Sequence, residues 1–246
     1  KMFSTEIHYE VVATKILKDG KEKTKFIIPN SVIIISDSAF YECKNLSIIN
    51  TPSCLTNIEE YAFYSCSNLK SIVLSKNIAL IDDFAFNNCT KLALTKFPEK
   101  LKTLSQNAFY GCTSLTSIEL PASLTNLQSY AFRKCENLVE VISKGNLSRI
   151  NASVFYDCTS LSKLVISNVT SVTILSNASA FTNTNNYLEI DINGKRINKN
   201  YLGKNIKNYD SMLVLSHFKG HPMGGYGGAL KQLSIGKIQI TDKEFM

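Results

Sequence analysis

The spacing of the cysteines is the feature of this chain that most strongly suggests chemistry. Six of the seven cysteines recur at intervals of 23 residues, and only Cys54 lies outside the series. The series is Cys43, Cys66, Cys89, Cys112, Cys135 and Cys158. Equivalent positions in a stack form a straight column, which cannot supply the tetrahedral cage that zinc needs. Disulfides would require parallel side chains to pinch together. The spacing therefore favours free buried thiols that pack like small apolar side chains, with no metal and no cofactor.

The other candidates for chemistry lie near the carboxyl end. His217 and His221 are four residues apart, as in a helical metal site, but Gly220 and Pro222 argue against a helix there. The glycine-rich stretch 224–228 could present backbone amides to an anion, although it matches no phosphate-loop or dinucleotide fingerprint. A flexible turn is the simpler interpretation. With only three histidines and no nucleophile motif, no catalytic residue is assigned, and the protein is expected not to be an enzyme.

The interval of 23 residues is the period of a repeat that occupies most of the chain. A phenylalanine precedes each repeated cysteine by three residues, and a leucine follows it by three. The phenylalanines are Phe40, Phe63, Phe86, Phe109, Phe132 and Phe155. Two further apolar positions recur upstream in every unit. One unit buries too little apolar surface to fold alone, so the units must stack into a solenoid around a continuous core.

Each unit contains a short segment that predicts a strand. Residues 69–74 and 115–120 place apolar side chains at positions that can face the core. Strands of successive units must lie parallel, and six of them would form a sheet about 24 Å across. Proline follows the segment in three units, which suits a turn that leaves the sheet. The Ala-Phe-x-x-Cys segment is expected to form the opposite wall as helical or 3-10 turns. Thr95 departs from the pattern at an inward aliphatic position.

Changes in composition divide the chain into three parts. Residues 1–31 contain two apolar runs and are expected to form a β-hairpin cap at the N-terminus. Residues 32–182 form the solenoid of six units and a degenerate seventh unit that lacks the cysteine. Residues 183–246 are rich in glycine and are expected to form a small α/β cap. Its predicted elements are strands at 209–216 and 237–241 and a short helix at 228–233. The predicted fold is thus an α/β solenoid with a parallel sheet on one face.

The repeat resembles that of the leucine-rich-repeat superfamily, specifically its BspA-like class. The motif is seen in Ile58-Glu-Glu-Tyr-Ala-Phe63-Tyr-Ser-Cys66-Ser-Asn-Leu69, and the resemblance covers residues 32–167. Proteins of this class are typically exported or attached to the surface of bacteria and some protozoa, and are implicated in adhesion and host contact. The resemblance therefore implies an extracellular or cell-surface location and a protein or extracellular-matrix ligand.

The tail resembles part of another family. Residues 215–236 are similar to a stretch of uncharacterised bacterial domains that occur beside ferredoxin-type iron–sulfur modules. Because no cysteine follows Cys158, the tail cannot itself supply thiolates to a cluster. A truncated fragment serving as a cap is the favoured interpretation, and a retained metal-linked or redox-linked activity is the alternative.

Charge and hydropathy limit the classes of partner. The net charge of +7 arises from 27 basic and 20 acidic residues that are interspersed, so nucleic acid is not an expected partner. No stretch approaches the roughly 18 apolar residues that span a bilayer, so no membrane insertion is expected. The chain start lacks the pattern of a secretory signal. Self-association through an uncovered end of the stack remains open.

The outward positions of the predicted sheet are the candidate binding residues. If Leu69, Ile72 and Leu74 face the core, then Ser71 and Val73 face solvent. The candidates are Ile48, Ser71, Val73, Leu94, Lys96, Ser117, Glu119, Glu140, Ile142, Lys163 and Val165. A contiguous apolar patch among them would indicate a protein partner. A second candidate surface carries the tyrosines that follow the repeated phenylalanine, namely Tyr41, Tyr64, Tyr110 and Tyr156. A purely architectural spacer is the competing hypothesis.

Overall fold

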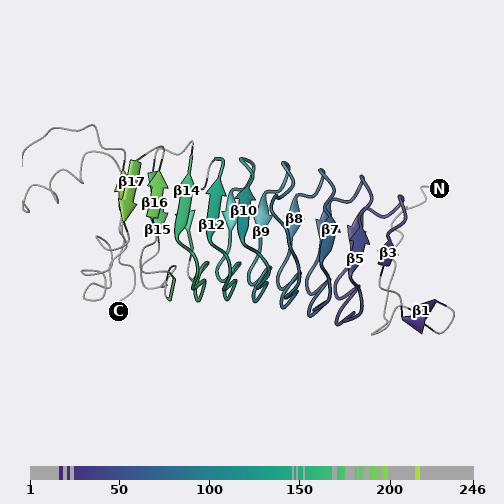
Figure 1. Cartoon of the computed structure of the whole chain (residues 1–246). Coiled ribbons are helices and arrows are strands. Elements are labelled where there is room, and N and C mark those ends of the chain that lie inside the picture. Colours follow the sequence, from purple (N-terminus) through teal and green to yellow (C-terminus); the bar gives the residue numbers. More distant parts are fainter. Residues whose placement is uncertain are drawn as a thin grey trace, which may run out of the picture.

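The computed structural model of the chain is an elongated stack of similar coils (Figure 1). It describes residues 17–18, 21–22, 25–145, 147, 149–151, 153–167, 171–174, 181, 183–184, 189–192, 195–198 and 214–216. Coils 1 to 6 are numbered by their repeated cysteine, from Cys43 in coil 1 to Cys158 in coil 6. The predicted solenoid with parallel strands is confirmed.

One wall of the stack is the main sheet, whose strands fall into two groups. The first group, in spatial order, is β3 (Lys25–Ile27), β5 (Ile48–Asn50) and β7 (Ser71–Val73). The second is β10 (Ser117–Leu120), β12 (Glu140–Ser143), β14 (Lys163–Ile166), β16 (Glu189–Ile192) and β17 (Lys195–Asn198). All pairs are parallel except the last, in which β17 runs antiparallel to β16.

Coil 3 interrupts the main sheet, which the sequence had predicted to be continuous. A single bridge between Lys96 and Glu119 joins this coil to β10. Thr95 occupies the position that Ile72 fills in coil 2, and its side chain is exposed. Two residues later Phe97, in the column of Leu120, is buried with its ring edge-on to the phenylalanine of coil 4 at 5.2 Å between centroids. A polar residue in the inward column does not hold a strand against the core, which explains the break.

A second, narrower sheet runs along the stack. Its first group, in chain order, is β4 (Ile34–Ile35), β6 (Asn57–Ile58), β8 (Leu80–Ile81), β9 (Thr103–Leu104) and β11 (Asn126–Leu127). Its second group is β13 (Arg149–Ile150), β15 (Ser171–Ile174) and β18 (Val214–Ser216). Here too the last strand is antiparallel, since β18 pairs antiparallel with β15. Both sheets therefore end in an antiparallel strand at the C-terminal end of the stack.

The wall opposite the main sheet, the turn wall, consists of successive tight turns. In coil 2 the amides of residues 61, 63 and 65 donate to carbonyls of coil 3, and the amides of residues 62, 64 and 66 close i+3 turns within the coil. These turns have the hydrogen bonds of a 3-10 helix, but no continuous helix forms among the described residues. Alternate amides point along the stack, and this requires two residues with a positive φ in each of coils 1 to 6. In coil 2 these residues are Tyr61, with a φ of 54°, and Ser65, with a φ of 55°.

The repeated phenylalanines and cysteines form two columns inside the turn wall. Neighbouring phenylalanine rings stack at 5.0 to 5.9 Å between centroids, and Phe181 continues the column beyond coil 6. Each cysteine from coil 2 onward donates its S–H to the carbonyl of the phenylalanine one coil earlier, at 3.0 to 3.1 Å. Cysteine suits this position because it is small and apolar and still satisfies a carbonyl.

None of the seven cysteines forms a disulfide, so the predicted thiol ladder is confirmed. Burial raises the pKa of Cys43 to about 11 and raises that of Cys89 well above its ordinary value. Thiols in this state are poor nucleophiles and poor metal ligands. The ladder is therefore structural.

The two ends of the chain are described only in part. Near the N-terminus, β1 (Leu17–Lys18) and β2 (Lys21–Glu22) form an antiparallel pair. The apolar run at 7–12, the histidine pair, the glycine-rich stretch and the elements predicted at 228–233 and 237–241 lie outside the described residues. Of the strand predicted at 209–216, the described part is β18.

Candidate protein-binding surfaces

The outer face of the main sheet carries the predicted binding residues in two columns. The strand register sets Ser117, Glu140 and Lys163 side by side, and likewise Glu119, Ile142 and Val165. In the first group of strands, Ile48 lies beside Ser71, and Val73 beside Asn50. The predicted columns thus exist, but coil 3 separates them into two patches.

The patch on β3, β5 and β7 combines exposed aliphatic residues with the exposed polar residues Lys25, Asn50 and Ser71. The side chain of Val73 is 61% exposed, and that of Ile27 is 75% exposed. Asn50 lies between them in the register, and Ile48 on the neighbouring column is half-buried. Ile27 was not among the predicted residues, although it lies 23 positions before Asn50 and so occupies the same column.

The patch on β10, β12 and β14 is bordered by ion pairs. Glu119 pairs with Lys144 and, at 4.0 Å, with Lys96. Lys163 pairs with Glu140 at 2.6 Å between nitrogen and oxygen. The hydrogen bond from Lys144 holds the pKa of Glu119 below its ordinary value. The predicted columns did not include Lys144, because it follows its strand rather than lying within it.

Two half-buried aliphatic residues belong to the same patch. Ile142 lies between Glu119 and Val165 in the register of β10, β12 and β14. The patch therefore has an apolar centre and a charged border, which is the usual composition of a protein interface.

Coil 3 contributes less to this face than the repeat predicts. Leu94 is half-buried and packs against the core, whereas its neighbour Thr95 is exposed. Lys96 projects into solvent, with its side chain 72% exposed. The regular alternation of inward and outward residues is lost where the strand is missing.

The turn wall carries an aromatic ridge over coils 1 to 3, formed by Tyr41, Tyr61, Tyr64 and Phe84. Tyr41 stacks on Tyr64, and Tyr61 stacks on Phe84, each at 5.0 Å between centroids. Tyr61 and Tyr64 meet edge to face at 5.6 Å, which joins the two stacks. The sequence pointed to Tyr41 and Tyr64. Tyr61 and Phe84 were missed, since they lie outside the column that follows the repeated phenylalanine.

A second aromatic group on the turn wall encloses a cation. The guanidinium of Arg133 lies 4.8 Å from the ring centroid of Tyr156 and 5.6 Å from those of Tyr110 and Tyr130. Its Nε is buried without a hydrogen-bond partner. Aromatic faces therefore hold this arginine by cation–π contact. Tyr110 and Tyr156 were predicted surface residues, and in the structure their rings contact the guanidinium of Arg133.

Besides Glu42, which pairs with Lys44, five carboxylates lie in the turn wall of coils 1 to 3, close to the aromatic ridge. They are Asp37, Glu59, Glu60, Asp82 and Asp83. Asp83 accepts a hydrogen bond from the amide of Gln106 at 2.7 Å. Burial, with Asp37, Asp83 and Asp82, raises the pKa of Glu60. Burial and Glu60 likewise raise the pKa of Tyr61, so this tyrosine and the acids share one surface.

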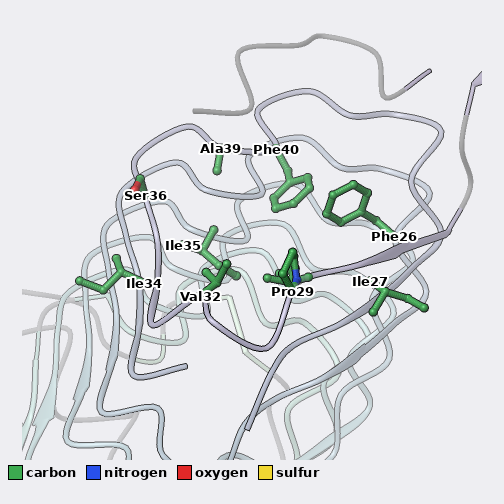
Figure 2. A pocket seen from close by; sticks show the side chains of 10 residues that line it. Phe26, Ile27, Pro29, Val32, Ile34, Ile35, Ser36, Ala39 and Phe40 are labelled. Atoms are coloured by element: carbon green, nitrogen blue, oxygen red, sulfur yellow. The ribbon is translucent and has the colours of Figure 1, made fainter. Parts of the chain in front are cut away.

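An apolar pocket of about 110 Å³ lies at the N-terminal end of the stack. Figure 2 shows the rings of Phe26 and Phe40 on one side, and Val32 and Ile35 on the other. Ser36 is the one lining residue with a polar side chain. The lining therefore contains no acid–base pair that could perform chemistry.

Two other kinds of site are absent from the described residues. Within the parts of the chain that the structure describes, no group of three His, Cys, Asp or Glu side chains could hold a metal ion. Across the same residues there is no helix long and apolar enough to cross a membrane.

Comparison with known proteins identifies the family of the repeat. The family model for the BspA type leucine rich repeat region, present in six copies, matches residues 13–139 and 81–208. A leucine-rich repeat protein from T. pallidum superposes with a TM-score of 0.56 at 29% identity, over 57% of this chain and 68% of that one. One from Bacteroides ovatus gives 0.53 at 26% identity, over 58% of this chain and 42% of that one. No curated protein matches.

Proposed function

The chain belongs to the BspA-type leucine-rich repeat family, and we propose that it is a non-enzymatic module that binds a protein through the outer face of its main sheet. One observation carries the proposal. The outward columns hold exposed aliphatic residues, Val73 and Ile27 above all, that the packing of the stack does not require. Single exposed aliphatics are common on protein surfaces, but these two lie in one outward column, on β3 and β7, with Asn50 of β5 between them.

The ion pairs on the same face support a protein partner. Glu119 and Glu140 are already paired with lysines of the chain. They are suited to border an interface rather than to react with a substrate. A partner that covers Ile142 and Val165 would exclude water from an apolar centre while the charged border stays solvated.

The proposed location is outside the cell. Proteins of the BspA-like class are typically exported or attached to a surface, and an adhesive or matrix-binding role follows from that resemblance. The chain spans 42% of the length of the similar B. ovatus protein, so the activity and partners of the whole protein are part of the proposal. A spacer without any saturable partner is the competing function.

The test is a binding screen of the whole chain against a panel of extracellular and matrix proteins. We expect saturable binding to at least one protein, and loss of that binding in the double variant Val73→Glu, Ile142→Lys. Both changes introduce charge at outward positions, so the fold should be kept, and circular dichroism checks this. If the double variant bound with the affinity of the wild type, the site would not be the main sheet. If no protein of the panel bound, the spacer would be favoured.

A further inference from the structure

The two positions of positive φ in each coil of the turn wall differ in the residues they carry. The position before the cysteine holds Glu42, Ser65, Asn88, Gly111, Lys134 and Asp157. None is aromatic or β-branched, as expected for a left-handed backbone. The position two before the phenylalanine holds Ser38, Tyr61, Phe84, Asn107, Tyr130 and Ser153. Three of these six are aromatic, although the backbone there disfavours bulky side chains.

The conformation of the turn therefore does not require aromatic residues at this position. The coils with Ser38, Asn107 and Ser153 show that the turn forms with small polar residues. Tyr61 and Phe84 instead stack on each other and adjoin Tyr64, on the outside of the wall. Unfavourable backbone positions of this kind concentrate at sites that recognise something.

The chain itself provides an example of what such rings bind. In the second half of the wall, Tyr130 at the same position shares Arg133 with Tyr110 and Tyr156. Arg133 occupies the column that Tyr41 and Tyr64 fill in coils 1 and 2. In coils 1 and 2 this column therefore carries tyrosine rings, whereas in coil 5 it carries an arginine of the chain itself.

The charge of the first half is complementary to a cation. Glu60 lies close enough to Asp37, Asp82 and Asp83 for these charges to act on it, and no described cation forms an ion pair with any of the four. The acids would add charge attraction to ring contact for an arginine, and would repel an acidic segment.

We propose that the aromatic ridge of Tyr41, Tyr61, Tyr64 and Phe84, with its flanking carboxylates, binds arginine side chains from an exposed basic segment of a partner protein. The ridge lies on the opposite wall from the main sheet, so this inference goes beyond the sheet-face function and does not depend on it. The guanidinium stacks on the rings, and the carboxylates accept its outward N–H groups.

The test measures binding of a synthetic arginine–glycine repeat peptide to the whole chain by fluorescence anisotropy. We expect saturable binding that weakens as ionic strength rises, with weaker binding of the lysine version and none of the glutamate version. The double variant Tyr61→Ser, Phe84→Asn uses residues that the chain places at the same position in coils 1 and 4. We expect it to raise the Kd by about tenfold without lowering the Tm.

The matched control is Tyr130→Asn, which changes the same position in coil 5, beyond the carboxylates. We expect it to leave the Kd for the arginine peptide unchanged. Equal affinity of the wild type and the double variant would overturn the proposal, as would equal binding of the arginine and glutamate peptides or failure of the wild type to bind. Dimerisation of the chain that is lost in the double variant, without peptide binding, would also overturn it and assign the ridge to a second copy.

Discussion

The main sheet and the turn wall enclose the same core, yet they tolerate different changes. In coil 3 the sheet loses its strand at Thr95, and β7 is left paired with β5 alone. In the same coil the turn wall is intact, with Phe86 and Cys89 fully buried and their hydrogen bonds to neighbouring coils in place. We infer that the columns of the turn wall hold the stack together more than the main sheet does. The main sheet is freer to vary its residues for recognition.

The two walls also treat charge differently. On the main sheet, Glu119 is paired with Lys144 and Lys96, and its pKa is lowered. On the turn wall, burial and the neighbouring acids raise the pKa of Glu60. The main sheet pairs its acids with its own lysines, whereas the turn wall keeps a negative charge that a partner can neutralise.

The largest effect on stability is expected from a change in the phenylalanine column, which is continuous through all six coils. Phe86→Ala removes a fully buried ring from the phenylalanine stack. We expect a loss of about 3–5 kcal/mol in the free energy of unfolding, measured by chemical denaturation. Leu115→Ala, also fully buried, should cost about 2–5 kcal/mol. A loss below about 0.5 kcal/mol in either variant would contradict the core described here.

A smaller effect is expected from repairing the sheet in coil 3. Thr95→Val restores an apolar side chain to the inward column, so a strand can form between β7 and β10 and bury it. We expect a gain of about 1 kcal/mol in the free energy of unfolding, and slower amide exchange in β7. An unchanged stability with unchanged exchange would mean that something other than Thr95 causes the break.

The smallest effects are expected at the two glutamates, and they should have opposite signs. The pKa of Glu119 is lowered in the folded state, so its contribution to stability is present above the ordinary pKa of glutamate and lost as pH falls. Glu119→Gln should therefore destabilise by less than about 1 kcal/mol at neutral pH. The pKa of Glu60 is raised, so ionisation destabilises the fold as pH rises, and Glu60→Gln should stabilise by less than about 0.5 kcal/mol.

Thermal unfolding at neutral and acidic pH checks both variants. Only at a pH below the lowered pKa of folded Glu119 are both carboxyls protonated in the folded and unfolded states, and there each variant should match the wild type. Shifts of the same sign in the two variants at neutral pH would contradict the contrast between the walls.

The inward columns could be predicted from the sequence because packing repeats with the period. Phe86, Cys89 and Leu92 must fill the same space in coil 3 as their equivalents in every other coil, so their types recur. The prediction of free thiols followed from the same geometry. Packing also fixes the direction of the outward columns, which is why Ser71 and Val73 are exposed as predicted.

Features that depend on contacts between coils escaped prediction. The strands of the second sheet are two residues long in coils 1 to 6 and leave no alternating pattern in the sequence. The positive φ of Tyr61 accompanies the hydrogen bond that its amide donates to the Asp83 carbonyl in coil 3, and it contradicts the backbone preference of tyrosine. The enclosure of Arg133 needs tyrosines from three coils at once. The sequence gives the positions of these residues along the stack but not their contacts.

Two matched single variants test whether the outer face of the main sheet recognises a protein. Val73→Glu places a charge in the exposed column of β7, whereas Val139→Glu makes the same change at a valine that is 46% exposed but lies outside the outward columns. Binding isotherms with a partner found in the screen should show saturation lost or strongly weakened for Val73→Glu and unchanged for Val139→Glu. Equal affinity of the two variants and the wild type would contradict the claim.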